Sequence, residues 1–193
     1  MSNKEGMLII ISGPSGVGKG AVINELFKDK SLNLAYSVSY TTRQPRNYEV
    51  PDINYFFVTK AEFEEKIKHN DFLEYTKFIN NYYGTSKSYV QQLQADGYNV
   101  ILEIEADGAK QVMRNYPDRK SAFSIFIMPP TFKVLEERIR LRATEPKAVI
   151  EERLNKAKEE FKLQDKYDYV VVNDVLEHTV KEVKKIIKKH IKP

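Results

Sequence analysis

A glycine-rich segment between an apolar run and a helical pattern constrains this chain more than any other stretch. Residues 8–11 are Leu, Ile, Ile and Ile, which predict a short strand buried on both faces. Gly13, Gly16 and Gly18 lack the Cβ atoms that would block a tight loop, so consecutive backbone N–H groups can turn toward one anion. Lys19 adds a positive charge at the start of a helical pattern. The spacing G-x-x-x-x-G-K between a strand and a helix therefore predicts a phosphate-binding loop made by Gly13, Pro14, Ser15, Gly16, Val17, Gly18, Lys19 and Gly20.

The loop departs from the usual pattern at Gly20, which stands where a Ser or Thr hydroxyl usually contacts Mg²⁺. We expect Mg²⁺ to be required with the nucleotide, but to be held by phosphate oxygens and water, with an acidic group elsewhere in the chain and no direct protein ligand. Activity undiminished by excess chelator would contradict this expectation.

Composition restricts the class of protein. A chain of 193 residues with 41% hydrophobic residues suits one compact domain, with room for inserted subdomains. Cysteine is absent, which excludes a disulfide framework. No charged-then-apolar leader precedes the first apolar run, and no apolar run approaches bilayer length. We therefore expect a cytoplasmic protein with no membrane partner.

The net charge of +4 raises the question of nucleic-acid binding. Much of the excess comes from lysines between residues 181 and 192, which surround an apolar stripe of Val180, Val183, Ile187 and Ile191. Such a pattern is typical of the solvated face of an amphipathic helix. Because no aromatic and basic recognition module accompanies the charge, we expect no nucleic-acid partner.

The order of the predicted elements indicates the fold class. Strands are expected at residues 8–11, 99–105, 121–128 and 167–173, and helical patterns lie between them. This alternation predicts an α/β fold with a parallel sheet flanked by helices, and a ligand site at the carboxyl edge of the sheet. A β-rich insert is expected before residue 86, with strands at 36–42, 53–59 and 72–78, a helix after the capping box of Thr59 and Glu62, and a turn at 80–84.

Two acidic residues end the strand expected at 99–105. Glu103 and Glu105 are two residues apart, so both side chains are expected on one face, near the phosphate loop. A carboxylate there could orient the water shell of Mg²⁺, and Glu103 is the candidate for such a contact through water. The alternative is an acidic surface turn.

Arginines follow on two expected helices. Arg138 and Arg142 are four residues apart, and Arg153 lies on the next helix. Arginines on such helices can neutralise a phosphoryl group in transfer, or simply pair with the glutamates beside them. A second anion site could combine Arg43, Arg46, Tyr55 and Tyr83, although cross-strand aromatic packing with charges at a sheet edge explains the same composition. His69, His178 and His190 show neither metal-ligand spacing nor a nucleophile partner.

Six motifs together resemble the guanylate kinase family over nearly the whole chain. They are GPSGVGKG at 13–20, SVSYTTRQPR at 37–46, NYYGTS at 81–86, LEIEADGA at 102–109, PP at 129–130 and VVND at 171–174. The resemblance implies a P-loop nucleoside monophosphate kinase that transfers the γ-phosphoryl group of ATP to GMP, and to dGMP, in guanine nucleotide metabolism. Asp107, in place of an amide, and Ala143, in place of a glycine, depart from the family pattern.

The resemblance also implies roles for individual residues. The GMP phosphate would contact Arg43, Arg46, Tyr55 and Tyr83, and the guanine would meet Ser39, Glu74 and Thr85, with Glu105 nearby. Lys19, Arg142 and Arg153 would stabilise the transferring phosphoryl group, while Arg138 contacts the ATP phosphates and Asn173 lies near the adenosine. The implied parts are a core of residues 1–36, 86–129 and 156–193, a GMP-binding insert of 37–85 and a lid of 130–155.

The chemistry of guanine supports Glu74 as its selector. Guanine presents N1–H and an exocyclic amine as adjacent donors, whereas adenine has an acceptor at N1 and would leave a carboxylate unpaired. One alternative is a kinase for another acceptor, such as a ribosyl phosphate, which has no base and would not need Glu74. A second is a catalytically silent module that binds phosphorylated peptides, but such modules typically lose the loop lysine, and Lys19 is present. The sequence predicts no oligomeric state.

Overall fold

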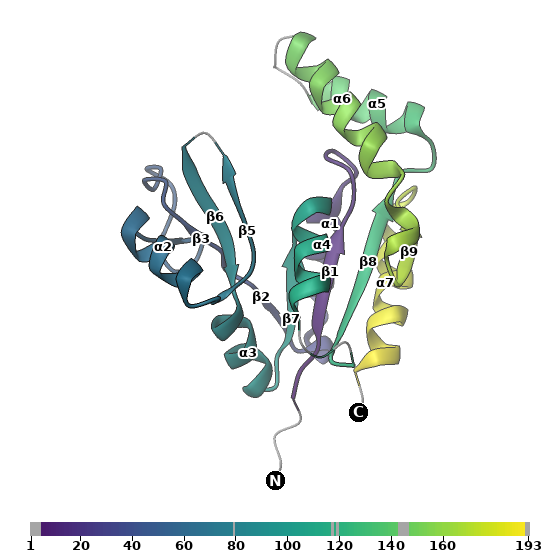
Figure 1. Cartoon of the computed structure of the whole chain (residues 1–193). Helices are drawn as coiled ribbons and strands as arrows, with labels where there is room; N and C mark the ends of the chain where they lie inside the picture. The colour runs from purple at the N-terminus through teal and green to yellow at the C-terminus, as the bar shows by residue number, and fades with distance from the viewer. Residues whose placement is uncertain (1–4, 79, 117, 119, 143–146, 192–193) are drawn as a thin grey trace.

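A computed structural model describes residues 5–78, 80–116, 118, 120–142 and 147–191, and its centre is a five-stranded parallel sheet (Figure 1). The strand order is β2-β7-β1-β8-β9. The strands are β1 (Leu8–Ser12), β2 (Leu34–Tyr36), β7 (Asn99–Glu103), β8 (Ala122–Met128) and β9 (Tyr169–Val172). All the described pairings in this sheet are parallel, which confirms the predicted α/β fold class.

Helices bury both faces of this sheet. Successive side chains of β1 point to opposite faces, so Ile9 and Ile11 join one core cluster and Leu8 and Ile10 join the other. The first cluster is covered by α1 (Lys19–Phe27) and α7 (Leu176–His190), and the second by α3 (Lys87–Ala95) and α4 (Ala106–Asn115). Because β1 is buried on both faces, the loop that follows it starts from a rigid base.

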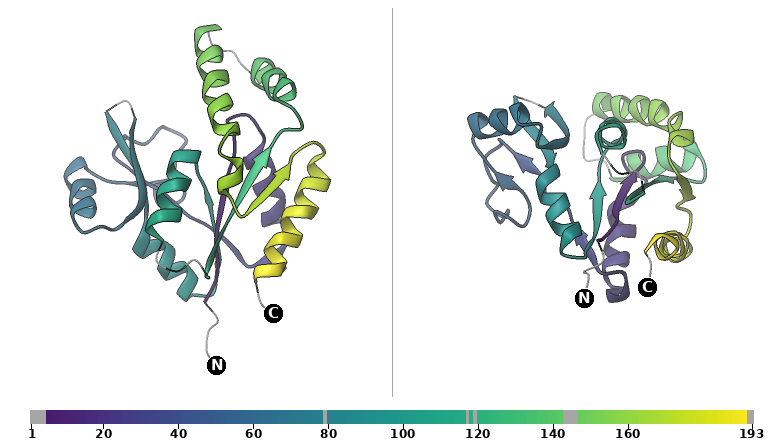
Figure 2. Two further views of the ribbon diagram at one scale, coloured as in Figure 1. Left: turned by 45° about the vertical axis from the view of Figure 1, so that its right-hand side comes forward. Right: turned by 60° about the horizontal axis from the view of Figure 1, so that its bottom comes forward.

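A second sheet lies beside the first (Figures 1 and 2). Its order is β4-β3-β6-β5, built from β3 (Tyr40–Thr41), β4 (Phe56–Phe57), β5 (Phe72–Phe78) and β6 (Asn81–Ser86). Helix α2 (Lys60–Lys68) begins at the predicted capping box of Thr59 and Glu62. Phe63 of α2 is fully buried, and its ring stacks on Phe72 at 4.3 Å between centroids. The second sheet therefore has an aromatic core of its own.

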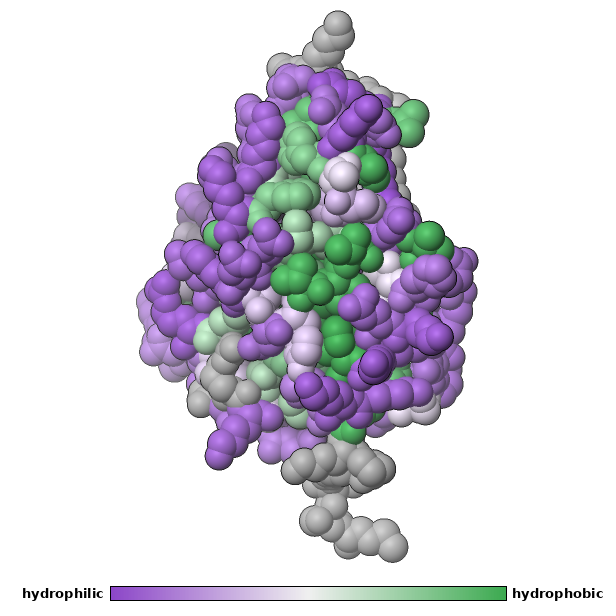
Figure 3. All heavy atoms as spheres, turned by 90° about the vertical axis from the view of Figure 1, so that its right-hand side faces the viewer, coloured by the Kyte–Doolittle hydropathy of each residue, from purple (hydrophilic) through white to green (hydrophobic). Residues whose placement is uncertain are grey.

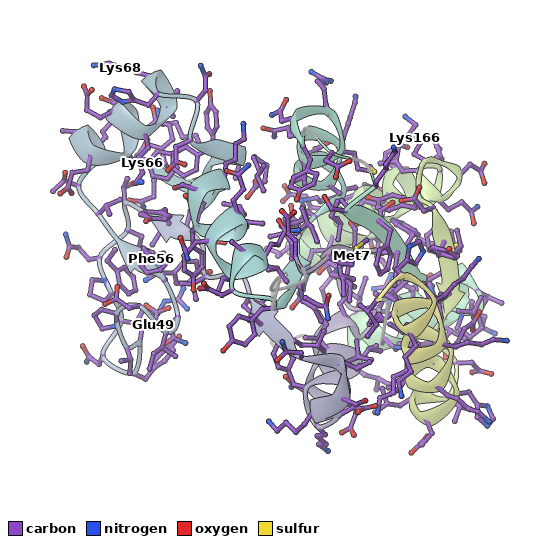
Figure 4. The ribbon with its side chains drawn as sticks, turned by 90° about the horizontal axis from the view of Figure 1, so that it is seen from below. Met7, Glu49, Phe56, Lys66, Lys68 and Lys166 are labelled. Carbon is purple, nitrogen blue, oxygen red and sulfur yellow. The ribbon has the colours of Figure 1, made fainter. Side chains whose placement is uncertain are left out.

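The view from below separates the two sheets (Figure 4). Glu49, Phe56, Lys66 and Lys68 lie together with the second sheet, and Met7 lies at the start of the parallel sheet. Contacts between α4 and β5 join the two parts, for example the hydrogen bond from Asn115 Nδ2 to the carbonyl of Leu73 at 3.0 Å. The boundaries implied for a core, an insert and a lid stay predictions.

Several expected elements differ from those observed. The sequence predicts a turn at 80–84, but residues 81–86 form β6, and Asn80 alone in that stretch has a positive φ of 65°. Packing of Tyr82 on the Phe63 ring of helix α2 outweighs the turn preference of the asparagines. Within the ranges 36–42 and 53–59, where whole strands were expected, the second sheet has only the two-residue strands β3 and β4.

Two helices extend beyond the carboxyl edge of the parallel sheet (Figures 1 and 2). They are α5 (Phe132–Arg142) and α6 (Lys147–Phe161), and α5 begins where the backbone N–H of Val134 donates to Thr131 Oγ1 at 3.2 Å. Buried apolar residues of both helices reach the first core cluster, among them Leu135, Ile139 and Leu154. The sequence also predicts that Thr144 caps the second of these helices and that Pro146 helps to start it, but both residues, like Ala143, lie outside the described residues. Short 3₁₀ helices, η1 (Lys30–Leu32) and η2 (Gln164–Lys166), complete the elements described.

The last helix has the predicted amphipathic character. Val180, Val183 and Ile187 are buried against the first core cluster, and basic residues occupy the last turn of α7. Figure 3 shows apolar side chains gathered in a strip on one side of the molecule. Val170 and Val172 of the edge strand β9 are among the exposed apolar residues. Among the described residues, no helix combines the length and the apolar character needed to cross a bilayer.

Candidate functional site

The glycine-rich loop lies at the carboxyl end of β1 and wraps one side of a cavity of about 410 Å³. Gly13 has φ 145° and Gly18 has φ 103°, values that L side chains rarely adopt. A Cβ on Gly13 would lie 2.2 Å from the carbonyl oxygen of Ile127, and one on Gly18 would lie 2.6 Å from Asn173 Nδ2. The strand, the glycine-rich loop and the helix follow one another as predicted. The loop residues that line the cavity are Gly13, Ser15, Gly16, Gly18, Lys19 and Gly20.

Two glycines of this loop make a matched pair for a stability test. Alanine at Gly18 has to adopt a positive φ and displace Asn173, so we expect a loss of about 1–3 kcal/mol in the free energy of unfolding. Gly20 lies in the first turn of α1, and a Cβ added to it would meet no heavy atom within 4 Å. Alanine at Gly20 should therefore gain about 0.5–1 kcal/mol. Urea unfolding of both variants measures this, and equal stabilities would contradict the described loop conformation.

Lys19 closes the loop on itself. Its Nζ donates to the carbonyl oxygens of Gly13 at 2.6 Å and Pro14 at 3.4 Å. Burial lowers the pKa of Lys19, and the nearby carboxylates of Glu103, Glu160 and Glu105 act in the opposite direction. The ammonium group is therefore held beside the cavity. It can leave the two carbonyl oxygens and bind an anion in the cavity with only a small movement.

Asn173 and Arg138 support the loop from behind. Asn173 Nδ2 donates to the carbonyl of Val17 at 2.7 Å, and Thr179 Oγ1 donates to Asn173 Oδ1 at 3.1 Å. Arg138 donates to the carbonyls of Asn173 at 3.0 Å and Val17 at 3.3 Å. The structure thus places both predicted nucleotide-binding residues next to the loop, where they fix its backbone.

Helix α6 presents one charged face to the loop. Arg153 Nη2 donates to Ser15 Oγ at 3.1 Å, and Lys156 Nζ donates to Glu105 Oε2 at 2.7 Å. Glu160, two turns after Arg153, also lines the cavity. Lys156 and Glu160 were not predicted, although their spacing from Arg153 places them on the same helix face. Arg142 lies on α5, but its side chain is not among those described.

Glu103 and Glu105 both line the cavity, but the reason given from the sequence is wrong for Glu105. The strand ends at Glu103, and Glu105 is the N-cap residue of α4, so strand alternation does not orient it. Glu103 Oε2 accepts a hydrogen bond from the Tyr36 hydroxyl at 3.3 Å. Burial and the charge of Glu103 raise the pKa of Tyr36, so this phenol stays a donor. Within the described residues, no three His, Asp or Glu side chains form a group that could hold a metal ion.

The second predicted anion site assembles on the other sheet. Arg43 lies 5.6 Å from the centroid of the Tyr55 ring, and the rings of Tyr55 and Tyr83 are 6.2 Å apart. Arg46 lies beside this group, and its guanidinium donates to the Tyr48 hydroxyl at 2.8 Å. Guanidinium and phenol donors are therefore close together, as a phosphate-binding role requires.

Glu49, which was not assigned a role from the sequence, holds these arginines. Arg43 donates to both carboxylate oxygens, at 2.8 and 3.0 Å, and the backbone N–H of Arg46 donates to Oε2 at 2.7 Å. The hydrogen bonds from Arg43 are the main reason that the pKa of Glu49 is lowered, and Glu49 in turn raises the pKa of Arg43. The side chain of Glu49 is only 7% exposed, so this pair is shielded from water.

The substitution Glu49→Gln should leave Arg43 in place but weaken the contact that fixes the orientation of its guanidinium group. For GMP, the acceptor that the resemblance implies, we expect the KM to rise roughly 3–10-fold while kcat changes little, because a charge-assisted bidentate contact that orients a binding group is lost. Steady-state kinetics measure both constants. Glu64→Gln, which removes an exposed carboxylate from α2, serves as the control. A lower KM would show instead that Glu49 competes with the phosphate for Arg43.

Glu74 is a buried carboxylate at the edge of the second sheet. It is 8% exposed, and the Thr85 hydroxyl donates to its Oε1 at 2.7 Å. Burial raises the pKa of Glu74. A Cβ on Gly108 of α4 would lie 3.2 Å from Oε2, so α4 approaches the carboxylate closely. Ser39 is half-buried just before β3, and its carbonyl accepts from the N–H of Phe56 at 2.9 Å.

A strand, a glycine loop with a lysine and a helix at the carboxyl edge of a parallel sheet define a P-loop nucleotide-binding protein. The family model described as guanylate kinase matches residues 5–190. The chain belongs to the guanylate kinase family.

Individual relatives agree with this family. A guanylate kinase of Mesoplasma florum is 53% identical over 97% of this chain, which spans 62% of that relative's length. A guanylate kinase of Oceanobacillus iheyensis is 47% identical over the whole chain and 92% of its own length. The crystal structure of guanylate kinase from Anaplasma phagocytophilum superposes with a TM-score of 0.72 at 30% identity, covering all of this chain and 90% of that one.

Proposed function

We propose that this protein transfers the γ-phosphoryl group of ATP to GMP, and to dGMP, giving ADP and the guanosine diphosphate. The relatives are named guanylate kinases. The observation that carries the proposal is the buried Glu74 with its Thr85 partner, on the same sheet as the cluster of Arg43, Tyr55 and Tyr83. Such a carboxylate matches the adjacent donors of guanine, and the cluster matches a phosphate.

The chemistry needs charge neutralisation and no general base. The acceptor phosphate of GMP is already an anionic nucleophile, so the protein has to align it with the donor and stabilise charge on the oxygens in transfer. We assign this role to Lys19, Arg138, Arg142 and Arg153. Arg153 and Lys19 already border the loop, where the donor phosphates would bind.

Mg²⁺ is part of this proposal and accompanies the nucleotide. Gly20 and Ala21 border the cavity and have no hydroxyl, so the position that usually supplies a side-chain oxygen to the ion does not do so here. Glu103 lines the same cavity and suits a contact to the hydration shell, because Mg²⁺ retains several waters in such sites. The ion would supply neutralisation of the phosphate charge. A cytoplasmic location and the absence of nucleic-acid and membrane partners stay expectations of the same proposal.

One assay tests the proposed function directly. ADP production is measured with GMP, dGMP, AMP, CMP and UMP as acceptors, with ATP or GTP as donor, and with and without excess chelator. We expect kcat/KM for GMP to exceed that for AMP by about 10⁴-fold, since a site built to pair donors of one base rejects a base without them. Preference for another acceptor would overturn the guanine assignment. Absence of turnover with every acceptor would favour a catalytically silent module.

A further inference from the structure

Glu160, at the end of α6, is a buried carboxylate that the proposed chemistry does not use. It is 6% exposed, and it lines the loop cavity together with Lys19 and Glu105. Within the described part of the chain, its Oε2 atom is buried and has no hydrogen-bond partner. One oxygen of a carboxylate that lines the cavity is thus left without a donor.

The charges around Glu160 come from several elements. Lys156 on α6 and Lys19 on α1 favour the ionised form, whereas Glu105 before α4 opposes it. Burial outweighs the lysines and raises the pKa of Glu160. Other titratable or charged groups lie nearby. Glu103 interacts electrostatically with Lys19, and Asp107 with Lys156. The charge of Glu160 affects the phenol of Tyr167, and Arg153 is hydrogen-bonded to Ser15.

A polyphosphate in the cavity would change this balance. Its negative charge would lie beside the carboxylate, and a like charge within about 4–6 Å raises the pKa of a carboxyl group by about 1–3 units. A protonated carboxyl group has one O–H donor, and a phosphate oxygen is a strong acceptor. The same side chain that repels the ligand when ionised can therefore bind it when neutral.

We propose that Glu160 is a phosphate-binding residue in its protonated form, whose unpartnered oxygen carries a proton taken from solvent and donates it in a hydrogen bond to a phosphate oxygen. The inference rests on the proposed function, because it requires a phosphorylated ligand in the cavity. Binding of a nucleotide then takes up as much as one proton per site.

Calorimetric titration with ADP in the absence of Mg²⁺ tests this proton uptake. Titrations in two buffers of different ionisation enthalpy, repeated between about pH 6 and pH 8, give the number of protons bound, and a phosphate group with a pKa near 6 contributes little at the upper end. A pKa increase of about 1–3 units predicts a maximum uptake by the carboxyl group of about 0.5–0.9 proton.

Two variants assign the proton to its site. Glu160→Gln keeps the shape and an N–H donor but does not titrate, so its uptake should fall to that of the ligand alone, with ADP still bound. Glu159→Gln is the matched control, since Glu159 is the neighbouring carboxylate, 71% exposed and paired with Lys162. This control should take up protons as the wild type does.

The possible outcomes are distinct. Equal proton uptake in the wild type and Glu160→Gln would overturn the inference while leaving the nucleotide site intact. If Glu160→Gln did not fold, the wild type alone would decide, because uptake no larger than that of the ligand's own phosphate at every pH between about pH 6 and pH 8 would also overturn the inference. A wild type that gave no heat with ADP, GMP or ATP would instead reject the proposed function.

Discussion

Methionine in place of Lys19 should lower kcat about 10²–10³-fold, the cost of removing one charged donor from a preorganised phosphate site. Lys19 is held by the carbonyls of Gly13 and Pro14 at the edge of the cavity, so its ammonium group reaches a bound phosphate with little rearrangement. KM for GMP should change less, because Arg43 and Glu74 lie on the other sheet. Coupled ADP-release kinetics measure both constants.

The control for this variant is Lys28→Met. Lys28 follows the same helix, but its side chain is 69% exposed and pairs with Glu25. We expect its kinetics to match those of the wild type. Thermal unfolding of Lys19→Met should show no loss of stability, because methionine relieves the desolvation that lowers the lysine pKa. Unchanged kcat would reject the assignment of the loop as the donor site.

The parallel sheet and the loop were predictable because their signals are local. An apolar run, three glycines and a lysine specify a strand, a turn and a helix start without help from distant residues. The register of the second sheet depends instead on contacts such as Phe63 with Phe72 and Tyr82. Those contacts join residues from different elements, and the turn preference of asparagine obscured β6.

The candidate site divides in the same way. Motifs identified Arg43 and Arg46, but not Glu49, which holds them through contacts that only the folded chain sets. Glu160 in the loop cavity was likewise not predicted. Glu105 lies near the loop, as expected, but it is the N-cap residue of α4 and does not belong to the strand where the sequence placed it. The place of a residue at the site is thus easier to predict from sequence than the packing that holds it there.

Glutamine in place of Glu74 should separate substrate selection from stability. One acceptor for the guanine donors is lost and replaced by an N–H₂ group, so kcat/KM for GMP should fall roughly 10–100-fold, which corresponds to about 1–3 kcal/mol. Activity with AMP should fall less or rise, because adenine has an acceptor at N1. Competition kinetics with both acceptors measure the change in selectivity.

The free energy of unfolding of Glu74→Gln should rise at neutral pH, although its kcat/KM for GMP falls. Burial raises the pKa of Glu74 in the folded state, so the folded protein prefers the neutral form. This contribution is fully present below the unfolded pKa of about 4.5 and is lost as the pH rises through the folded value. At neutral pH the variant should therefore melt at a higher temperature than the wild type, and the difference should vanish in acid.

Glu64→Gln should change neither selectivity nor this pH dependence, because Glu64 is exposed. A Glu74→Gln enzyme that kept its preference for GMP would place the guanine elsewhere, and a lower melting temperature at neutral pH would show that the carboxylate stabilises the fold.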